Sequence, residues 1–296
     1  MADLKNEDDT RRSPVSGRAR HESGTESEHH GVQGNVNSYF DSEAAYWDAV
    51  YRGEDLQGLI YRQRQAAVLD SVGAAGLRSG AAALEIGCGA GHLTVELARR
   101  GLRVDAVDAS AAMVDATAER TRAAGFEQDV SVGVADVHAL PYESGHYDLV
   151  VAVGVIPWLH SPGAAVHEMV RVLRPGGWLI LTADNRLRLT SFTDPRAMLA
   201  LTPLRRIYHA LRKRDGVAMS RLDSPRTVDR FLLDGGLRPV GRRTVGFGPM
   251  SLLGRPIFSD VRGVRIDRRL QAQTDRGVPL LRWTGWHYVV SAEKLP

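Results

Sequence analysis

The stretch LEIGCGAGHLTVELARRGLRVDAVDAS, residues 84–110, decides the fold of this 296-residue chain. A short apolar segment leads into a glycine-rich turn, and an amphipathic helix then leads to a second apolar segment. The glycines at 87, 89 and 91 allow a tight turn whose backbone a bulky ligand can approach closely. The third glycine comes one residue too early for the dinucleotide pattern G-x-G-x-x-G, and no Gly-Lys-Ser/Thr of a phosphate-binding loop follows. The turn therefore indicates a ligand other than a dinucleotide or a nucleoside triphosphate.

Apolar segments and helical segments alternate from residue 81 to residue 183. We expect strands at 82–86, 103–107, 130–134, 147–155 and 178–183, with helices at 91–100, at 110–124, and from 162 to the RPGG turn at 174–177. Two last strands are expected at 237–248 and 287–295, after a short helix that starts at Ser224-Pro225 and ends at Gly235-Gly236. Strands separated by helices of about 10–15 residues form parallel sheets with both faces covered. The predicted fold class is therefore α/β, a doubly wound, mostly parallel seven-stranded sheet with helices on both faces.

Composition divides the chain into five segments. Residues 1–34 hold six apolar residues and no aromatic one, so they cannot form a core and we expect a disordered tail. The aromatic-rich stretch NVNSYFDSEAAYWDAVY follows directly and indicates the start of ordered structure. The expected segments are a tail at 1–34, N-terminal cap helices at 35–80, a ligand-binding core at 81–185, a basic helical insert at 186–236 and the last strands at 237–296.

Carboxylates follow the expected strands at the points where those strands end. Ligands of doubly wound sheets bind outside these carboxyl ends. Asp108 follows the second strand, where a carboxylate can accept hydrogen bonds from both hydroxyls of a ribose, and Asp136 follows the third, where it can accept from an adenine amino group. Glu85 ends the first strand and can accept from a cationic or hydroxyl-bearing group. A ligand with a ribose, an adenine and a positive charge is indicated, and S-adenosylmethionine has all three.

Residues 84–181 resemble the class I, Rossmann-like methyltransferases that use S-adenosylmethionine, and most of all their type 11 small-molecule branch. The matching pieces, in family order, are LEIGCGAG, VDAVDAS, ADVHALPY, YDLVVAVGVI and RVLRPGGWLIL. The upstream NSYFDSEAAYWDAVY is similar to the cap helix of ubiquinone O-methyltransferases and magnesium-protoporphyrin methyltransferases. The resemblance implies S-adenosyl-L-methionine as the cofactor. It implies a cofactor site made of Tyr39, Trp47, Glu85, Gly87, Cys88, Gly89, Gly91, Asp108, Ala109, Met113, Asp136, Val137 and Val153.

Groups that act on the acceptor are expected after the fourth and fifth strands. Relatives often carry a histidine at the position of Pro157 or Trp158, so we expect His160, close by, either to replace it as a general base or to be a packing histidine. In catechol-type relatives an Asp-Asn pair, here Asp184 and Asn185, joins a carboxylate after strand four to bind magnesium. Residues 154–161 contain no carboxylate, so we predict a metal-independent enzyme in which Asn185 orients the acceptor.

Charge is unevenly distributed along the chain. Residues 185–270 hold 19 Arg or Lys against seven Asp and no Glu, a balance of +12, so the rest of the chain carries −9 within a net charge of +3. Within this region residues 203–214 place an apolar stripe on one helix face, with basic residues beside it. This helix is expected either to cover the acceptor pocket, attracting an anionic or amphiphilic acceptor at a membrane surface, or to be an ordinary solvated helix.

Methyl transfer to an oxygen, nitrogen or carbon of a small-molecule or lipid-like acceptor, by direct displacement, is the predicted function. The alternatives are an RNA or protein methyltransferase that uses the basic 185–270 surface, and a non-catalytic cofactor-binding protein. The chain lacks a separate RNA-binding module and an Asn-Pro-Pro-aromatic motif after strand four, so no nucleic-acid partner is expected. The longest uncharged apolar run has 11 residues, short of the ~20 that span a bilayer. A single cysteine suits a reducing compartment, so we expect a cytoplasmic protein, with peripheral membrane contact as an option. Nothing in the residues indicates an oligomeric state.

Overall fold

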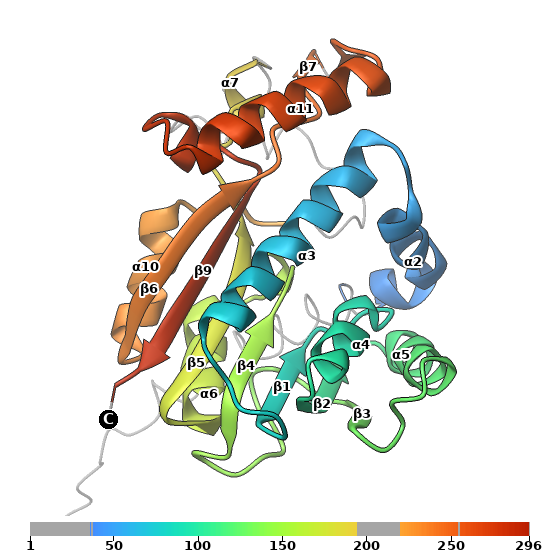
Figure 1. The fold of residues 1–296 in the computed structure, drawn as a ribbon, viewed down its shortest axis with the longest axis vertical. Coiled ribbons are helices and arrows are strands. Elements are labelled where there is room, and N and C mark those ends of the chain that lie inside the picture. The colour runs from blue at the N-terminus through green and yellow to red at the C-terminus, as the bar shows by residue number, and fades with distance from the viewer. Residues whose placement is uncertain (1–35, 37, 194–219, 254, 296) are drawn as a thin grey trace, which may run out of the picture.

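The structure is a computed structural model, and it describes residues 36, 38–193, 220–253 and 255–295. The tail expected at 1–34 and the helix expected at 203–214 lie outside the described residues. A twisted seven-stranded sheet forms the centre of the molecule, in the order β3-β2-β1-β4-β5-β9-β6 (Figure 1). Its strands are β1 Ala82–Ile86, β2 Arg103–Asp108, β3 Val130–Val134, β4 Tyr147–Ala152, β5 Leu173–Asp184, β6 Leu237–Val245 and β9 His287–Lys294.

Helices cover both faces of this sheet. They are α2 Ala44–Arg52, α3 Leu56–Ala74, α4 His92–Arg99, α5 Ala111–Ala123, α6 Pro162–Val172, α7 Thr190–Thr193, α10 Pro225–Asp234 and α11 Asp260–Asp275. Two 3-10 helices, Ile156–Trp158 and Leu281–Trp283, and a two-stranded sheet of β7 Ser251–Leu252 and β8 Arg255–Pro256 complete the described elements. In Figure 1, α3 and α4 lie in front of the sheet and α6 and α10 behind it. The predicted fold class is confirmed.

The two hydrophobic cores follow from the alternation of side chains along the strands. On β1 Leu84 faces the core beneath α6 and α10, whereas Ala83 faces the core beneath α3 and α4. On β4 Val150 and Leu149 divide in the same way. Successive strand side chains point to opposite faces, and both faces of a parallel sheet are covered, so these strands are apolar throughout.

The first five strands are parallel, and β9 runs antiparallel between β5 and β6. Asp184 at the end of β5 pairs with His287 at the start of β9, and His287 pairs with Val245 at the end of β6. The whole connection 246–286, including α11, therefore lies at the edge of the sheet where the parallel strands end. The sequence prediction contained no helix at 260–275.

Serine N-caps set the start of two of the predicted helices. The hydroxyl of Ser110 accepts a hydrogen bond from Met113 N, and that of Ser224 accepts from Thr227 N, as N-caps do. Ser161 stands at the N-cap of α6 without such a bond. The helix that precedes the RPGG turn ends at Val172, and β5 already begins at Leu173, five residues before the expected strand. No helix in the described part of the chain is long and apolar enough to cross a membrane.

Candidate functional site

The glycine loop between β1 and α4 has the left-handed backbone that its sequence predicts. Gly87, Gly89 and Gly91 have φ angles of 70°, 55° and 77°, which glycine adopts without steric cost. A Cβ atom on Gly87 would also collide with the side chain of Val155. One on Gly91 would lie 3.0 Å from Cα of Thr117 on α5, so this glycine lets α4 and α5 approach closely. The loop leaves its backbone open toward the adjoining cavity at Gly87 and Gly89.

The Asp108 carboxylate fixes the loop from the end of β2. Its Oδ2 atom accepts a hydrogen bond from Gly89 N at 3.0 Å, and its Oδ1 atom accepts from Ser110 N at 2.9 Å. Burial raises the pKa of Asp108, and the backbone N–H donors offset part of that rise. Each carboxylate oxygen has a second lone pair, so Asp108 can hold the loop and still accept from a ligand hydroxyl.

One large cavity opens beside the glycine loop, with an empty volume of about 1330 Å³ that includes its mouth. Eleven of the thirteen predicted cofactor residues line it: Trp47, Glu85, Gly87, Cys88, Gly89, Asp108, Ala109, Met113, Asp136, Val137 and Val153. Tyr39 and Gly91 do not line it. Tyr39 instead stacks on Trp158, a lining residue, with ring centroids 5.9 Å apart. Gly91 acts as the N-cap of α4.

Glu85 is a buried acid, exposed by only 2%. Its Oε2 atom accepts a hydrogen bond from the Thr94 hydroxyl at 2.6 Å. Burial is the main cause that raises the pKa of Glu85 to about 8, and the nearby charge of Asp108 adds to it. A raised pKa favours the protonated form, whose carbonyl oxygen can still accept a hydrogen bond.

The loop after β3 pairs Asp136 with His138. The Asp136 carboxylate accepts from the backbone N of His138 at 2.9 Å and lies 2.8 Å from its Nδ1 atom. The ring of His138 packs on that of His160, with centroids 4.0 Å apart. His160 does not line the cavity. This histidine thus packs against the loop that bears Asp136 without lining the cavity.

Asn185 also lies outside the cavity lining. It is fully buried, and its amide donates to the carbonyl oxygens of Trp283 at 2.8 Å and Gly285 at 2.9 Å. Its Oδ1 atom accepts from Leu187 N at 2.9 Å. These three hydrogen bonds to backbone groups join the end of β5 to the segment before β9, so the amide has a structural role.

A second polar group lines the cavity from α3 and β5, and it consists of Tyr61, Arg64 and Asp184. The sequence had pointed to Asp184 only as one half of a magnesium-binding Asp-Asn pair, and it had not pointed to Tyr61 or Arg64. Arg64 is 6% exposed, donates to the Tyr51 hydroxyl at 2.8 Å and lies with its guanidinium 4.5 Å from the Tyr61 ring centre. It forms no ion pair with a carboxylate among the residues that the structure describes. The same face of α3 also buries Ile60 and Ala67. An arginine within this apolar helical stripe was the sequence signal that could have identified Arg64 as a candidate site residue.

The neighbours of Asp184 favour its charged form. Burial opposes ionisation, but the hydrogen bond from His287 and the positive charges of Arg64 and Arg188 outweigh it and lower the pKa of Asp184. The pKa of His287 is lowered as well, chiefly by burial. A carboxylate that faces the cavity can accept a proton or a hydrogen bond from a ligand there.

The cap helix α2 is fixed over the cavity by Asp48. His92 Nε2 lies 2.9 Å from Oδ1 of Asp48, and Arg120 and Arg52 pair with the same carboxylate. The ring of Tyr51 stacks on His92 with centroids 4.9 Å apart. These contacts hold α2 against α4 and α5. In the described ranges, no three His, Cys, Asp or Glu side chains are grouped closely enough to bind a metal ion.

Comparison with known proteins agrees with this geometry. Residues 84–181 match the family model described as a methyltransferase domain. Methyltransferase GfsG of Streptomyces halstedii is 35% identical over 108 residues, which are 36% of this chain and 38% of that protein. A ubiquinone biosynthesis O-methyltransferase of Bordetella bronchiseptica is 25% identical over 183 residues, 60% of this chain and 70% of that protein. The solved magnesium protoporphyrin IX methyltransferase of Synechocystis PCC 6803 with bound SAH has a TM-score of 0.59 at 17% identity, covering 89% of this chain and 99% of its own.

The structural likeness shows a shared fold, and the chain spans little more than a third of the Streptomyces relative. The family match contains the glycine loop, Asp108 and Asp136, which are the residues that line the cavity from β1, β2 and β3. The chain therefore contains a methyltransferase domain at residues 84–181, and its described residues share the fold of the solved magnesium protoporphyrin IX methyltransferase.

Proposed function

We propose that this protein transfers the methyl group of S-adenosylmethionine to an oxygen, nitrogen or carbon atom of a small-molecule or lipid-like acceptor. The observation that carries the proposal is a single cavity that spans the carboxyl ends of β3 to β5. Asp136 and Asp108 line it from the strands at one side, and Asp184 lines it from β5 at the other. Such a cavity can hold a nucleoside cofactor and a second reactant side by side.

The cofactor half would be held by three charged side chains. Asp108 would accept hydrogen bonds from the ribose hydroxyls, and Asp136 would accept one from the adenine amino group. Arg64 would pair with the carboxylate of the methionine moiety, since its buried guanidinium has no carboxylate partner within the described residues and lies beside Gly154. A buried arginine that forms no ion pair is costly, and an anionic ligand group at its guanidinium lowers that cost. The bound cofactor supplies a methyl group that its sulfonium charge activates for displacement.

The acceptor half would be formed by Tyr61 and Asp184. In the displacement the S–CH3 bond breaks, a bond from the methyl carbon to the acceptor atom forms, and an acceptor hydroxyl or amine loses its proton. Asp184 lines the cavity and its neighbours lower its pKa, so it is better placed than His160 or Asn185 to take that proton or to orient the donor. Metal independence remains a prediction from the absence of a carboxylate at residues 154–161.

The predicted partner is a small molecule. A cytoplasmic location, an anionic acceptor and membrane contact through residues 203–214 remain sequence-based predictions, and the last of these falls outside the described residues.

Methyl transfer is tested with S-adenosylmethionine labelled at the methyl group. The purified full-length chain is incubated with a lipid and small-molecule extract, with total RNA, and with protein extract, and the labelled fraction is identified. Label in the extract of small molecules supports the proposal, and label in RNA or protein alone supports the alternative acceptors. Absence of label from all three, with cofactor binding intact by calorimetry, would indicate a cofactor-binding protein without this activity. Asp108→Ala, which should weaken cofactor binding, serves as the control in which labelling at a low cofactor concentration should fall.

A further inference from the structure

The connection between β6 and β9 carries an exposed surface that methyl transfer does not use. We define the tip surface as the β7–β8 hairpin, the residues that follow it to 259, and the outward face of α11. Five of the fifteen large apolar side chains that are exposed in the described residues lie in this surface. They are Leu252, Leu253, Ile257, Phe258 and Val261, exposed by 38% to 72%. Scattered exposed apolar residues are ordinary, but this clustering is typical of an interaction site.

The outward face of α11 is strongly cationic. A shallow surface groove along the helix is lined by Val261, Val264, Arg265, Arg268, Arg269 and Ala272, which places these side chains on one face. Arg265 and Arg269 form no ion pair or hydrogen bond with any residue that the structure describes. Arg255 and Arg262 are exposed next to the apolar residues at 257–261. Positive charge and apolar side chains thus share one surface.

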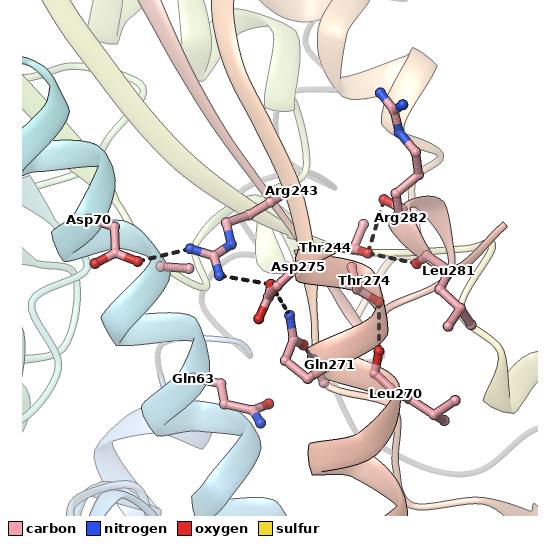
Figure 2. A network of polar contacts seen from close by, with 12 residues as sticks. Gln63, Asp70, Arg243, Thr244, Leu270, Gln271, Thr274, Asp275, Leu281 and Arg282 are labelled. Atoms are coloured by element: carbon pink, nitrogen blue, oxygen red, sulfur yellow. Dashed lines mark hydrogen bonds and ion pairs between the residues drawn. The ribbon is translucent and has the colours of Figure 1, made fainter. Parts of the chain in front are cut away.

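Of the three acidic side chains of α11, only Asp267 is buried, whereas Asp260 and Asp275 are exposed near the two ends of the helix. The exposed arginines at 255, 262, 265, 268 and 269 outnumber these two carboxylates, so the surface stays cationic. Asp267 is fully buried and accepts from Phe247 N at 2.6 Å and from Gln63 of α3 at 2.7 Å. Asp275 accepts from Gln271 at 3.0 Å and from Arg243 at 3.3 Å (Figure 2). This polar network ties α11 to β6 and to α3.

We infer that the tip surface docks on a bilayer of anionic lipids. An anionic bilayer offers negative headgroups to the arginines and hydrocarbon to the leucines, Ile257 and Phe258, whereas a nucleic acid offers the aliphatic side chains no comparable environment. A helix with a cationic outward face and adjacent apolar residues lies in the interfacial plane of such a membrane. Charge complementarity therefore selects the membrane over a neutral or a cationic partner.

Docking at the tip surface brings the cavity close to the membrane. The connection 246–286 lies at the edge of the sheet where the cavity opens, and α3 both contacts Asp267 through Gln63 and lines the cavity through Tyr61 and Arg64. The docking of the tip surface on the bilayer does not depend on whether the protein transfers methyl groups. That a lipid-like acceptor enters from the bilayer is a consequence that rests on the proposed function.

The test is co-sedimentation of the full-length chain with vesicles of phosphatidylcholine alone and with vesicles of phosphatidylcholine and phosphatidylglycerol in equal parts. We expect binding only to the mixed vesicles. Arg265→Glu combined with Arg269→Glu should weaken it by ~10-fold or more, since each basic residue contributes about 1 kcal/mol near an anionic surface. Ile257→Ser combined with Phe258→Ser should weaken it as well, including at high salt, because burial of apolar groups is not screened.

The matched control reverses two exposed arginines with the same helical spacing on α10, Arg226→Glu with Arg230→Glu, and should leave vesicle binding unchanged. All variants should keep the parent's affinity for S-adenosylhomocysteine, measured by calorimetry, which also shows that they fold. Equal loss in the α10 variant, or vesicle binding unaffected by the tip variants, overturns the proposal. Loss caused only by Arg212→Glu, Lys213→Glu and Arg214→Glu assigns the membrane contact to the insert instead. Selective loss of RNA binding in the tip variants assigns the surface to nucleic acid.

Discussion

Oδ1 of Asp184, at the end of β5, lies 3.1 Å from Nδ1 of His287, the first residue of β9. The two residues are 103 positions apart in the chain and are paired across the antiparallel strands. His287 is 2% exposed, and no described residue makes a hydrogen bond to its Nε2 atom. The histidine therefore hydrogen-bonds to Asp184 without lining the cavity, whereas the carboxylate itself lines it.

If Asp184 takes the acceptor's proton or orients its donor, Asp184→Asn should lower turnover by a factor of ~10² or more, the usual contribution of a positioned base. Affinity for S-adenosylhomocysteine should stay near that of the parent. Once the labelling assay identifies an acceptor, steady-state rates provide the measurement. His160→Ala is the comparison, and we expect it to change turnover far less. A large loss of turnover in His160→Ala, with Asp184→Asn still active, would identify His160, in the loop after β4, as the base.

Arg64→Met should weaken binding of S-adenosylhomocysteine by ~10-fold or more, because the ligand carboxylate would lose a charged hydrogen-bond partner. Binding of 5′-methylthioadenosine, which lacks the amino-acid moiety, should change little. Calorimetry with both ligands makes the comparison. An equal loss for the two ligands would mean that Arg64 shapes the cavity without contacting the carboxylate.

Asp108→Ala should weaken both of those ligands, since each contains the ribose. Losing the ribose acceptor leaves buried polar groups unpaired, at a cost of roughly 1–3 kcal/mol, or about tenfold or more in affinity. Asp108→Asn keeps one carbonyl acceptor and should lose less. Unchanged affinity in Asp108→Ala by calorimetry would remove the ribose assignment.

Glu85 should make the protein less stable as pH rises. Its pKa is about 8 in the folded protein and about 4.5 when unfolded, so between these values the folded state holds a proton that the unfolded state has lost. Its contribution is present below pH 4.5 and declines up to about pH 8, by up to roughly 1.4 kcal/mol per pH unit. Glu85→Gln should flatten the free energy of unfolding across that window, measured by urea denaturation at several pH values. Parallel curves for parent and variant would contradict the raised pKa.

Methyl transfer should persist after dialysis against EDTA, because residues 154–161 supply no carboxylate to complete a magnesium site with Asp184 and Asn185. The Asn185 amide is also engaged by backbone groups. The labelling assay before and after dialysis gives the comparison. Activity lost with EDTA and restored by magnesium would show that a metal takes part.

The glycine loop, the strands around it and the carboxylates at their ends could be predicted because each rests on a local pattern. Left-handed backbone at Gly87 and Gly89 requires glycine, and buried parallel strands are apolar on both faces, so short stretches carry these signals. Eleven of thirteen predicted cofactor residues line the cavity for this reason, since all but Trp47 lie in or beside those stretches.

Tertiary structure decided which groups come together in the acceptor half of the cavity, and it alone revealed the tip surface. Asp184 and His287 meet because β9 inserts antiparallel between β5 and β6, a pairing that no local pattern specifies. The helix α11 was not predicted because its buried face consists of the polar residues Asp267, Gln271 and Thr274. Their burial is possible because Asp267 and Gln271 accept hydrogen bonds from distant backbone groups and Thr274 donates one to the backbone of its own helix. Hydrophobic periodicity cannot reveal a helix whose inner face is polar, because those polar groups are satisfied only when the folded chain brings their partners to them.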